Sequence, residues 1–265
     1  MNSLRFKTAS LALLLICSSA LAGELRERFE KTCVMQPEGR FSLENTNGMV
    51  QINAWDRAEV NIVAEKIVRA SREKDAQHLL EATEIIIREA SNQVDVFTRT
   101  PKTGGDSFWG WMFGEGGNQV TVNYIITVPR EIYMKIISVN GKIDAREISG
   151  KAELSTTNGG IEVEDAQGSI SAETTNGRIM VSLREVDRDE AMRFETTNGS
   201  VTAEFPRDFS AKISARTTNG SIRCDFPLTT ESRSGRHSLE GRIGNSGGSV
   251  TLRTTNGSIA IRERS

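Results

Sequence analysis

The sequence predicts an all-β dominated protein, in which a small N-terminal α+β part with one short helix precedes a parallel β-solenoid, or β-helix-like, repeat array. Three observations predict this fold class. The tetrapeptide Thr-Thr-Asn-Gly occurs five times, the residues around each copy alternate between apolar and polar, and the copies recur about every twenty residues. Self-similarity at such a period is typical of repeat proteins, in which each unit packs against its neighbours.

Residues 1–22 form a segment of their own. Arg5 and Lys7 precede a short apolar run, and the segment ends in Ala20-Leu21-Ala22. A basic start, an apolar run too short to span a bilayer and an A-x-A end predict a secretory signal peptide that is cleaved near Ala22. We therefore expect an exported protein, periplasmic or secreted, that is soluble after cleavage.

Composition narrows the class of protein further. The chain is 37% hydrophobic and 26% charged, which is typical of a globular protein. Removal of residues 1–22 takes away two basic and no acidic residues, so the formal net charge moves from −2 to −4. This balance gives no electrostatic basis for nucleic-acid binding. Cys33 and Cys224 could form a single disulfide after export, but we favour Cys224 as a small inward-facing hydrophobe.

Residues 23–130 carry strand patterns interrupted by one helical pattern. Ser71 is placed to cap a helix, and Ala76, Leu79 and Leu80 follow at helical spacing. We expect this helix to cover a sheet edge or an open end of the array.

Residues 131–265 form the array. Isoleucine or valine stands two residues after every glycine of the Asn-Gly pairs, and alternation continues on both sides, which predicts half-buried strands. The residues predicted to face the core are Ile161, Val163, Ile170, Ile179, Val181, Phe194, Val201, Ile213, Ile222, Val250, Leu252 and Ile259. The outward positions mix acidic and basic residues, as expected of a solvated face.

The Asn-Gly pairs are predicted to be structural turn residues, because both residues tolerate positive φ. They are Asn47-Gly48, Asn140-Gly141, Asn158-Gly159, Asn176-Gly177, Asn198-Gly199, Asn219-Gly220 and Asn256-Gly257. Two folds fit: an antiparallel meander with a hairpin at each pair, and a solenoid with the pair at a corner. A hairpin has no need of the preceding Thr-Thr, whereas stacked coils would set like residues over like. We therefore favour the solenoid, with Asn158, Asn176, Asn198 and Asn219 successive along one edge.

Asn47-Gly48, Trp55-Asp56-Arg57 and Val128-Pro129, together with the Asn-Gly strands, form a pattern that covers nearly all of the chain after residue 22. In this pattern the chain resembles the bacterial DUF4097 family of "putative adhesin" proteins. It implies an exported, β-rich, solenoid-like protein of the cell envelope, and it supplies no catalytic motif. We expect Trp55 to pack at the end of its strand.

The sequence contains few residues in patterns typical of catalytic or metal-binding sites. His78 and His237 have no second histidine or cysteine at ligand spacing, so we expect no metal site and no cofactor. Dense acidic clusters occur at Glu162–Gly168 and Arg184–Glu190, but neither has the spacing of a calcium loop, and we interpret them as solvated turns.

The segment Gly104–Gly117 contains an aromatic cluster between glycines. Its apolar side chains either cap an open end of the array or form an exposed binding tip, and we favour the tip. The cluster comprises Phe108, Trp109, Trp111, Met112 and Phe113.

The sequence thus predicts a non-enzymatic envelope protein, either a binding module or a structural one. The ligand would be a protein, a glycan or a membrane surface. The alternatives are a polysaccharide-cleaving β-helix enzyme, with acids converging on one groove, and a scaffold that associates with itself.

Overall fold

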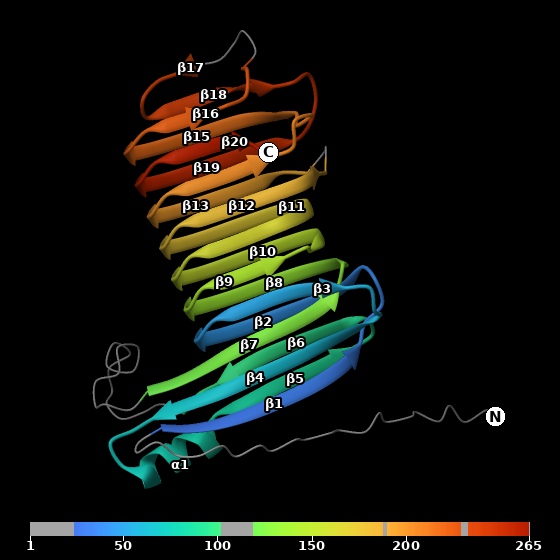
Figure 1. Ribbon diagram of the computed structural model, residues 1–265, viewed down its shortest axis with the longest axis vertical. Coiled ribbons are helices and arrows are strands. Elements are labelled where there is room, and N and C mark those ends of the chain that lie inside the picture. The colour runs from blue at the N-terminus through green and yellow to red at the C-terminus, as the bar shows by residue number, and fades with distance from the viewer. Residues whose placement is uncertain (1–23, 102–118, 188–189, 229–232, 265) are drawn as a thin grey trace, which may run out of the picture.

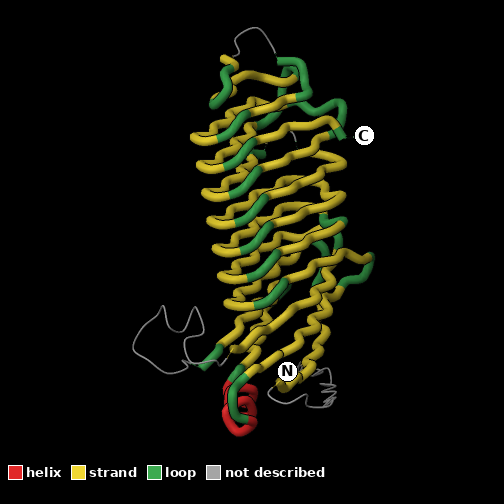
Figure 2. Tube along the Cα trace, turned by 60° about the vertical axis from the view of Figure 1, so that its left-hand side comes forward, coloured by secondary structure: helices red, strands yellow, loops and turns green. Residues whose placement is uncertain are grey.

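A computed structural model describes residues 24–101, 119–187, 190–228 and 233–264 of the chain. These residues form twenty strands and one α-helix (Figure 1). All strands belong to one large mixed sheet, which curls into a nearly closed, flattened barrel (Figure 2). The predicted all-β class with one short helix is confirmed.

One side of the barrel, here called the asparagine face, consists of strands that each end at an asparagine. In spatial order they are β2 (Gly39–Asn47), β8 (Glu131–Asn140), β10 (Ser149–Asn158), the second half of β11 (Ile161–Asn176), β13 (Met192–Asn198), β19 (Ser249–Asn256) and β15 (Ala211–Asn219). Each neighbouring pair is parallel, so antiparallel hairpins closing at each Asn-Gly are ruled out for these strands.

The opposite side of the barrel, here called the second face, is built in the same way. Its parallel neighbours, in spatial order, are β7 (Gln119–Pro129), β3 (Val50–Trp55), β9 (Ile143–Arg146), the first half of β11, β12 (Ile179–Val186), β14 (Val201–Phe205), β20 (Ile259–Glu263) and β16 (Ile222–Cys224). The chain passes from one face to the other at each Asn-Gly, because the asparagine ends a strand of one face and the glycine precedes a strand of the other.

Antiparallel strands occur at both ends of the barrel, which makes the sheet mixed. At the N-terminal end β4 (Glu59–Arg69) joins β7 to β1 (Glu24–Val34), while β6 (Gln93–Arg99) pairs in parallel with β2 and antiparallel with β5 (Glu84–Ala90). At the C-terminal end β18 (Ser238–Ile243) runs antiparallel to both β15 and β17 (Arg233–Ser234). Further strands thereby cover the edges of the parallel strips at β2, β7 and β15.

The single helix, α1 (Glu73–Ala82), lies against β1 and β4 at the N-terminal end of the barrel (Figure 1). Ala76 and Leu79 are buried, as their spacing predicts. The predicted capping residue is wrong: Arg72, not Ser71, occupies the N-cap, and its side chain makes no capping hydrogen bond. Burial of the apolar stripe therefore fixes where this helix lies.

The order of the units in space differs from their order in the chain. The last unit, β19 and β20, lies between the unit of β13 and β14 and the unit of β15 and β16. The prediction that Asn219 follows Asn198 along the edge is therefore wrong, because Asn256 lies between them. The long gap in the sequence before Asn256 contains β17 and β18, which cover the end of the stack before the chain returns.

The predicted core is buried with one exception. Eleven of the twelve inward residues are at most 2% exposed, whereas Ile222 is only partly buried. Ile222 lies in β16, the last strand of the second face, and among the described strands β16 pairs with β20 alone. The inward residues are thus fully buried along the barrel and become partly exposed at its C-terminal end.

The two cysteines outside residues 1–22 are free thiols in strands at opposite ends of the barrel, β1 and β16 (Figure 1). Burial raises the pKa of the Cys33 thiol to about 11, which keeps it protonated at neutral pH. Cys224 is partly buried against the core, close to the expected role of a small hydrophobe.

Candidate functional site

The asparagines of the repeated motif form a continuous ladder at one corner of the barrel. The asparagines follow one another in the order 47, 140, 158, 176, 198, 256 and 219, and from Asn140 onward each side-chain amide donates from Nδ2 to Oδ1 of the preceding asparagine at 2.7–2.8 Å. Such ladders satisfy amide groups at the same spacing as the strands themselves. The asparagines therefore have a structural partner on the adjacent unit.

The glycines of the motif allow successive units to approach closely at the same corner. A Cβ atom built on Gly177 would lie 2.0 Å from the carbonyl oxygen of Gly159. The glycine N–H groups in turn donate to asparagine carbonyls of the next unit, as Gly177 does to Asn198 at 3.0 Å. Any side chain at these positions would push two units apart.

The first threonine of each motif also serves the fold. Thr156, Thr174, Thr196, Thr217 and Thr254 are at most 7% exposed. Each Oγ1 donates to a glycine carbonyl of an adjacent unit at 2.8–3.1 Å. These five buried hydroxyl groups therefore have their hydrogen bonds satisfied within the fold.

The second threonine of each motif behaves differently. Successive residues of a strand point to opposite faces, so this side chain projects outward where the first one projects inward. All five are exposed, and within the described part of the chain none of their hydroxyl groups makes a hydrogen bond. They are Thr157, Thr175, Thr197, Thr255 and Thr218, in spatial order. Three of the four positions of the repeated motif have structural partners or close contacts in an adjacent unit, and this one does not.

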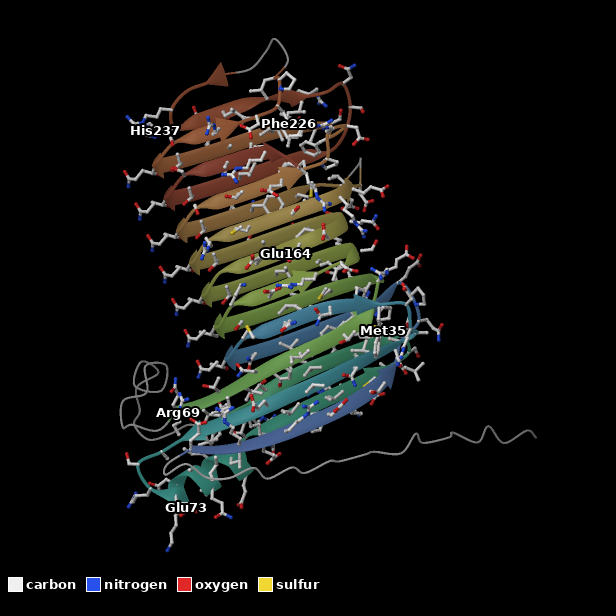
Figure 3. All side chains as sticks on the ribbon, viewed as in Figure 1. Met35, Arg69, Glu73, Glu164, Phe226 and His237 are labelled. Carbon is white, nitrogen blue, oxygen red and sulfur yellow. The ribbon has the colours of Figure 1, made fainter. Side chains whose placement is uncertain are left out.

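The exposed threonines line a groove of about 700 Å³ on the asparagine face, here called the threonine groove. His237 lies at its C-terminal end, at the corner where the strands of this face end (Figure 3). The groove is lined by both threonines of the five motifs and by Ser155, Glu173, Glu195, Arg216, His237 and Arg253.

A row of charged side chains runs beside the exposed threonines. In spatial order it reads Glu173, Glu195, Arg253 and Arg216, so acids and bases balance. Arg193 lies 3.2 Å from Glu173 and 2.7 Å from Glu195, and Arg253 lies 3.7 Å from the other oxygen of Glu195. The groove carboxylates are therefore engaged by arginines.

The second face carries a network of charges on β9 and β11. Asp144 is 7% exposed and accepts hydrogen bonds from Lys142 and Arg146, both at 3.0 Å. Burial of Asp144 opposes its charged form, but the two hydrogen bonds prevail and lower the pKa of this carboxyl group. Lys142 also pairs with Glu162, and Arg146 lies 3.5 Å from Glu164.

The remaining residues singled out from the sequence are dispersed. Asp165, in the first acidic cluster, pairs with Arg264, and Glu190 in the second lies 3.5 Å from Lys151. The described residues contain no group of three histidine, cysteine or acidic side chains that could hold a metal ion. The proposed aromatic tip, Phe108, Trp109, Trp111, Met112 and Phe113, lies outside the described residues.

The threonine groove was missed by the sequence reasoning, which explained both threonines together as stacking residues. The signal that could have found it is the alternation of the strands. Two adjacent threonines cannot both face inward, so at most one of them can serve the core.

Comparison with known proteins identifies the family of the repeated part of the chain. Residues 132–262 match the family described as Toastrack DUF4097. This part of the chain belongs to the DUF4097 family. The resemblance inferred from the sequence is thus confirmed for the array, whereas Asn47-Gly48 and Trp55 lie outside the matched residues. Trp55 lies at the end of β3, and its Nε1 donates to the carbonyl oxygen of Glu59 at 2.7 Å.

Solved structures similar to this chain come from several bacteria. A "putative cell adhesion protein" from Clostridium sporogenes has 14% identity and a TM-score of 0.41, over 89% of this chain and 100% of that one. A "putative adhesin" from Bacteroides fragilis has 10% identity and a TM-score of 0.28, over 89% and 97%. A "putative lipid binding protein" from Parabacteroides distasonis has 8% identity and a TM-score of 0.32, over 90% and 97%. Similarity at these identities and TM-scores does not indicate which ligand this chain binds.

No curated protein matches the chain significantly. Within the described ranges, no helix has both the length and the apolar character needed to cross a membrane.

Proposed function

We propose that this protein is a non-enzymatic binding module and that the threonine groove is its recognition surface. The observation that carries the proposal is the contrast between the two threonines of the repeated motif. The first is buried and bonded within the fold, while the second is exposed and leaves its hydroxyl group free to bond a ligand. Because the strands hold these hydroxyl groups in fixed positions, a ligand would meet a pre-organised surface.

The ligand class that fits the groove is an extended, uncharged polysaccharide. Successive exposed threonines lie on adjacent strands, about 4.8 Å apart, which suits a chain molecule rather than a compact one. Hydroxyl groups both donate and accept, as sugar hydroxyl groups do. The balanced row of Glu173, Glu195, Arg253 and Arg216 favours a neutral polymer over a highly charged one.

The binding proposal is favoured over polysaccharide cleavage by the state of the groove carboxylates. A glycoside hydrolase needs two carboxyl groups about 5–10 Å apart that act as acid and as base or nucleophile. Glu173 and Glu195 share Arg193, whose guanidinium lies 3.2 Å from one oxygen of Glu173 and 2.7 Å from one oxygen of Glu195. This pairing suits recognition of sugar hydroxyl groups rather than proton transfer.

We further propose that the protein works in the bacterial cell envelope after export, either in the periplasm or outside the cell. The support is the signal-peptide pattern of residues 1–22. In this proposal, residues 23–130 and 131–265 form one stack of parallel units, a solenoid whose ends are covered by antiparallel strands and by α1.

Calorimetry with a panel of soluble oligosaccharides tests the proposal, using neutral and acidic chains long enough to cross all five threonines. We expect saturable binding to a neutral chain, weaker binding to acidic ones, and no new reducing ends after prolonged incubation. Absence of binding across the panel would refute the polysaccharide assignment. The appearance of reducing ends would refute the non-enzymatic one.

A further inference from the structure

The last unit of the described chain occupies a slot between two units that are consecutive in the sequence. β19 pairs on one side with β13 and on the other with β15, while β20 pairs with β14 and β16 (Figure 1). The segment 249–264 therefore separates units that could otherwise be neighbours.

The strands on either side of the slot, β13 and β15, pair with the repeated motif of β19. Along the asparagine face, Thr196, Thr254 and Thr217 lie in one register, as do the corresponding asparagines. The outward positions also match, because Arg253 faces Glu195 from the position that Arg216 occupies on β15. Any strand with the sequence Arg-Thr-Thr-Asn-Gly could make these contacts, including the same segment of another copy.

A short glycine-rich hinge connects this segment to the preceding hairpin. Residues 244–248 lie between the end of β18 and the start of β19, and Gly244 and Gly247 have φ values of 64° and 99°. Such backbone angles favour glycine, so the direction of the chain here is set by a few residues whose backbone can adopt angles that other residues rarely reach. Hinges of this kind are where identical elements are exchanged between protomers.

We propose that a second copy of this chain fills the slot with its own segment 249–264, so that two copies form a strand-exchanged dimer. Every ladder, threonine and arginine contact of the slot is kept in the exchange, because the incoming segment is identical. The hinge alone changes conformation. Each threonine groove then contains Arg253 and Thr255 of the other copy, which makes the candidate binding surface a shared one.

Single-cysteine variants test this exchange directly. Thr197 and Thr255 are exposed neighbours on adjacent parallel strands, at a spacing compatible with a disulfide. Thr197→Cys and Thr255→Cys chains are unfolded together, refolded as a mixture and oxidised. We expect a reducible dimer band that neither variant gives alone, with the single variants also measuring any background from Cys33 and Cys224.

Two controls keep the result interpretable. A mixture of Thr157→Cys and Thr255→Cys should give no such band, because β10 lies three strands from β19. The double variant Thr197→Cys/Thr255→Cys in one chain should close a disulfide, which shows that the geometry permits it. If the double variant closes within single chains while the mixture gives no dimer at any protein concentration, the exchange does not occur.

Discussion

The side chain of Asn256 donates a 2.7 Å hydrogen bond to the side chain of Asn198, which lies 58 residues earlier in the chain. This contact joins the last described unit to the array and continues the ladder to Asn219. Register here is set by amide groups at the corner and by apolar residues inside, and both repeat in every unit.

Replacement of Asn198 by alanine should interrupt this ladder. The change removes the donor to Asn176 and the acceptor for Asn256. Because water reaches this corner, we expect a loss of about 1 kcal/mol in the free energy of unfolding, measured by denaturant titration. Ser200→Ala, two residues away and outside the ladder, is the matched control and should be nearly neutral.

The two threonines of one motif should differ in their contribution to stability. Thr174→Val removes the buried hydrogen bond to Gly159 and should lower the free energy of unfolding by about 1–2 kcal/mol. Thr175→Val, at the exposed neighbouring position, should change it by less than about 0.5 kcal/mol. Equal losses in the two variants would show that both threonines serve the fold.

Gly177→Ala should separate two units at the corner. The added Cβ would lie 2.0 Å from the carbonyl oxygen of Gly159, which is backbone and cannot move without its whole unit. We expect a loss of about 3 kcal/mol and a lower melting temperature. Gly160→Ala, whose Cβ would lie 3.2 Å from the nearest atom, is the milder control. A neutral Gly177→Ala would refute the close approach of the units.

Asp144 should make stability depend on acid. Its pKa is lowered in the folded protein, where the hydrogen bonds from Arg146 and Lys142 outweigh burial, so its contribution is present above the unfolded pKa and is lost as pH falls through the folded one. The difference in the free energy of unfolding between the native protein and Asp144→Asn should therefore shrink as pH falls from about 6 to about 2. A difference that does not change with pH would contradict the role assigned to this carboxyl group.

The sequence was sufficient to predict the all-β class and, apart from Ile222, the inward residues, because each follows from a local pattern. It could not predict the order of the units. Phe194 faces Leu252 and not its sequential successor Ala215, yet both strands present the same alternation and the same motif. Because β15 and β19 offer β13 the same register, the choice between them depends on the hairpin of β17 and β18. The repeat period of the sequence does not reveal this hairpin.

The other errors have similar causes. Ile222 has the same local pattern as its buried counterparts, and only its place at the end of the stack leaves it partly exposed. Ser71 suits an N-cap, but Ala76 and Leu79 must pack against the sheet, and the helix begins where that packing allows. The threonine groove was not predicted because the two threonines of a motif are identical in the sequence. In the structure they lie on opposite sides of the strand.

The most direct test of the division between the two threonines is the dissociation constant of a Thr175→Val/Thr197→Val variant for the oligosaccharide that the native protein binds most tightly. The control is Ser182→Ala/Thr202→Val, on the second face, and melting temperatures are measured for all three proteins. We predict that the groove variant binds at least about tenfold more weakly, a change of about 1.4 kcal/mol, with an unchanged melting temperature, and that the control binds normally. Unchanged binding by the groove variant would contradict the claim that these hydroxyl groups form the recognition surface.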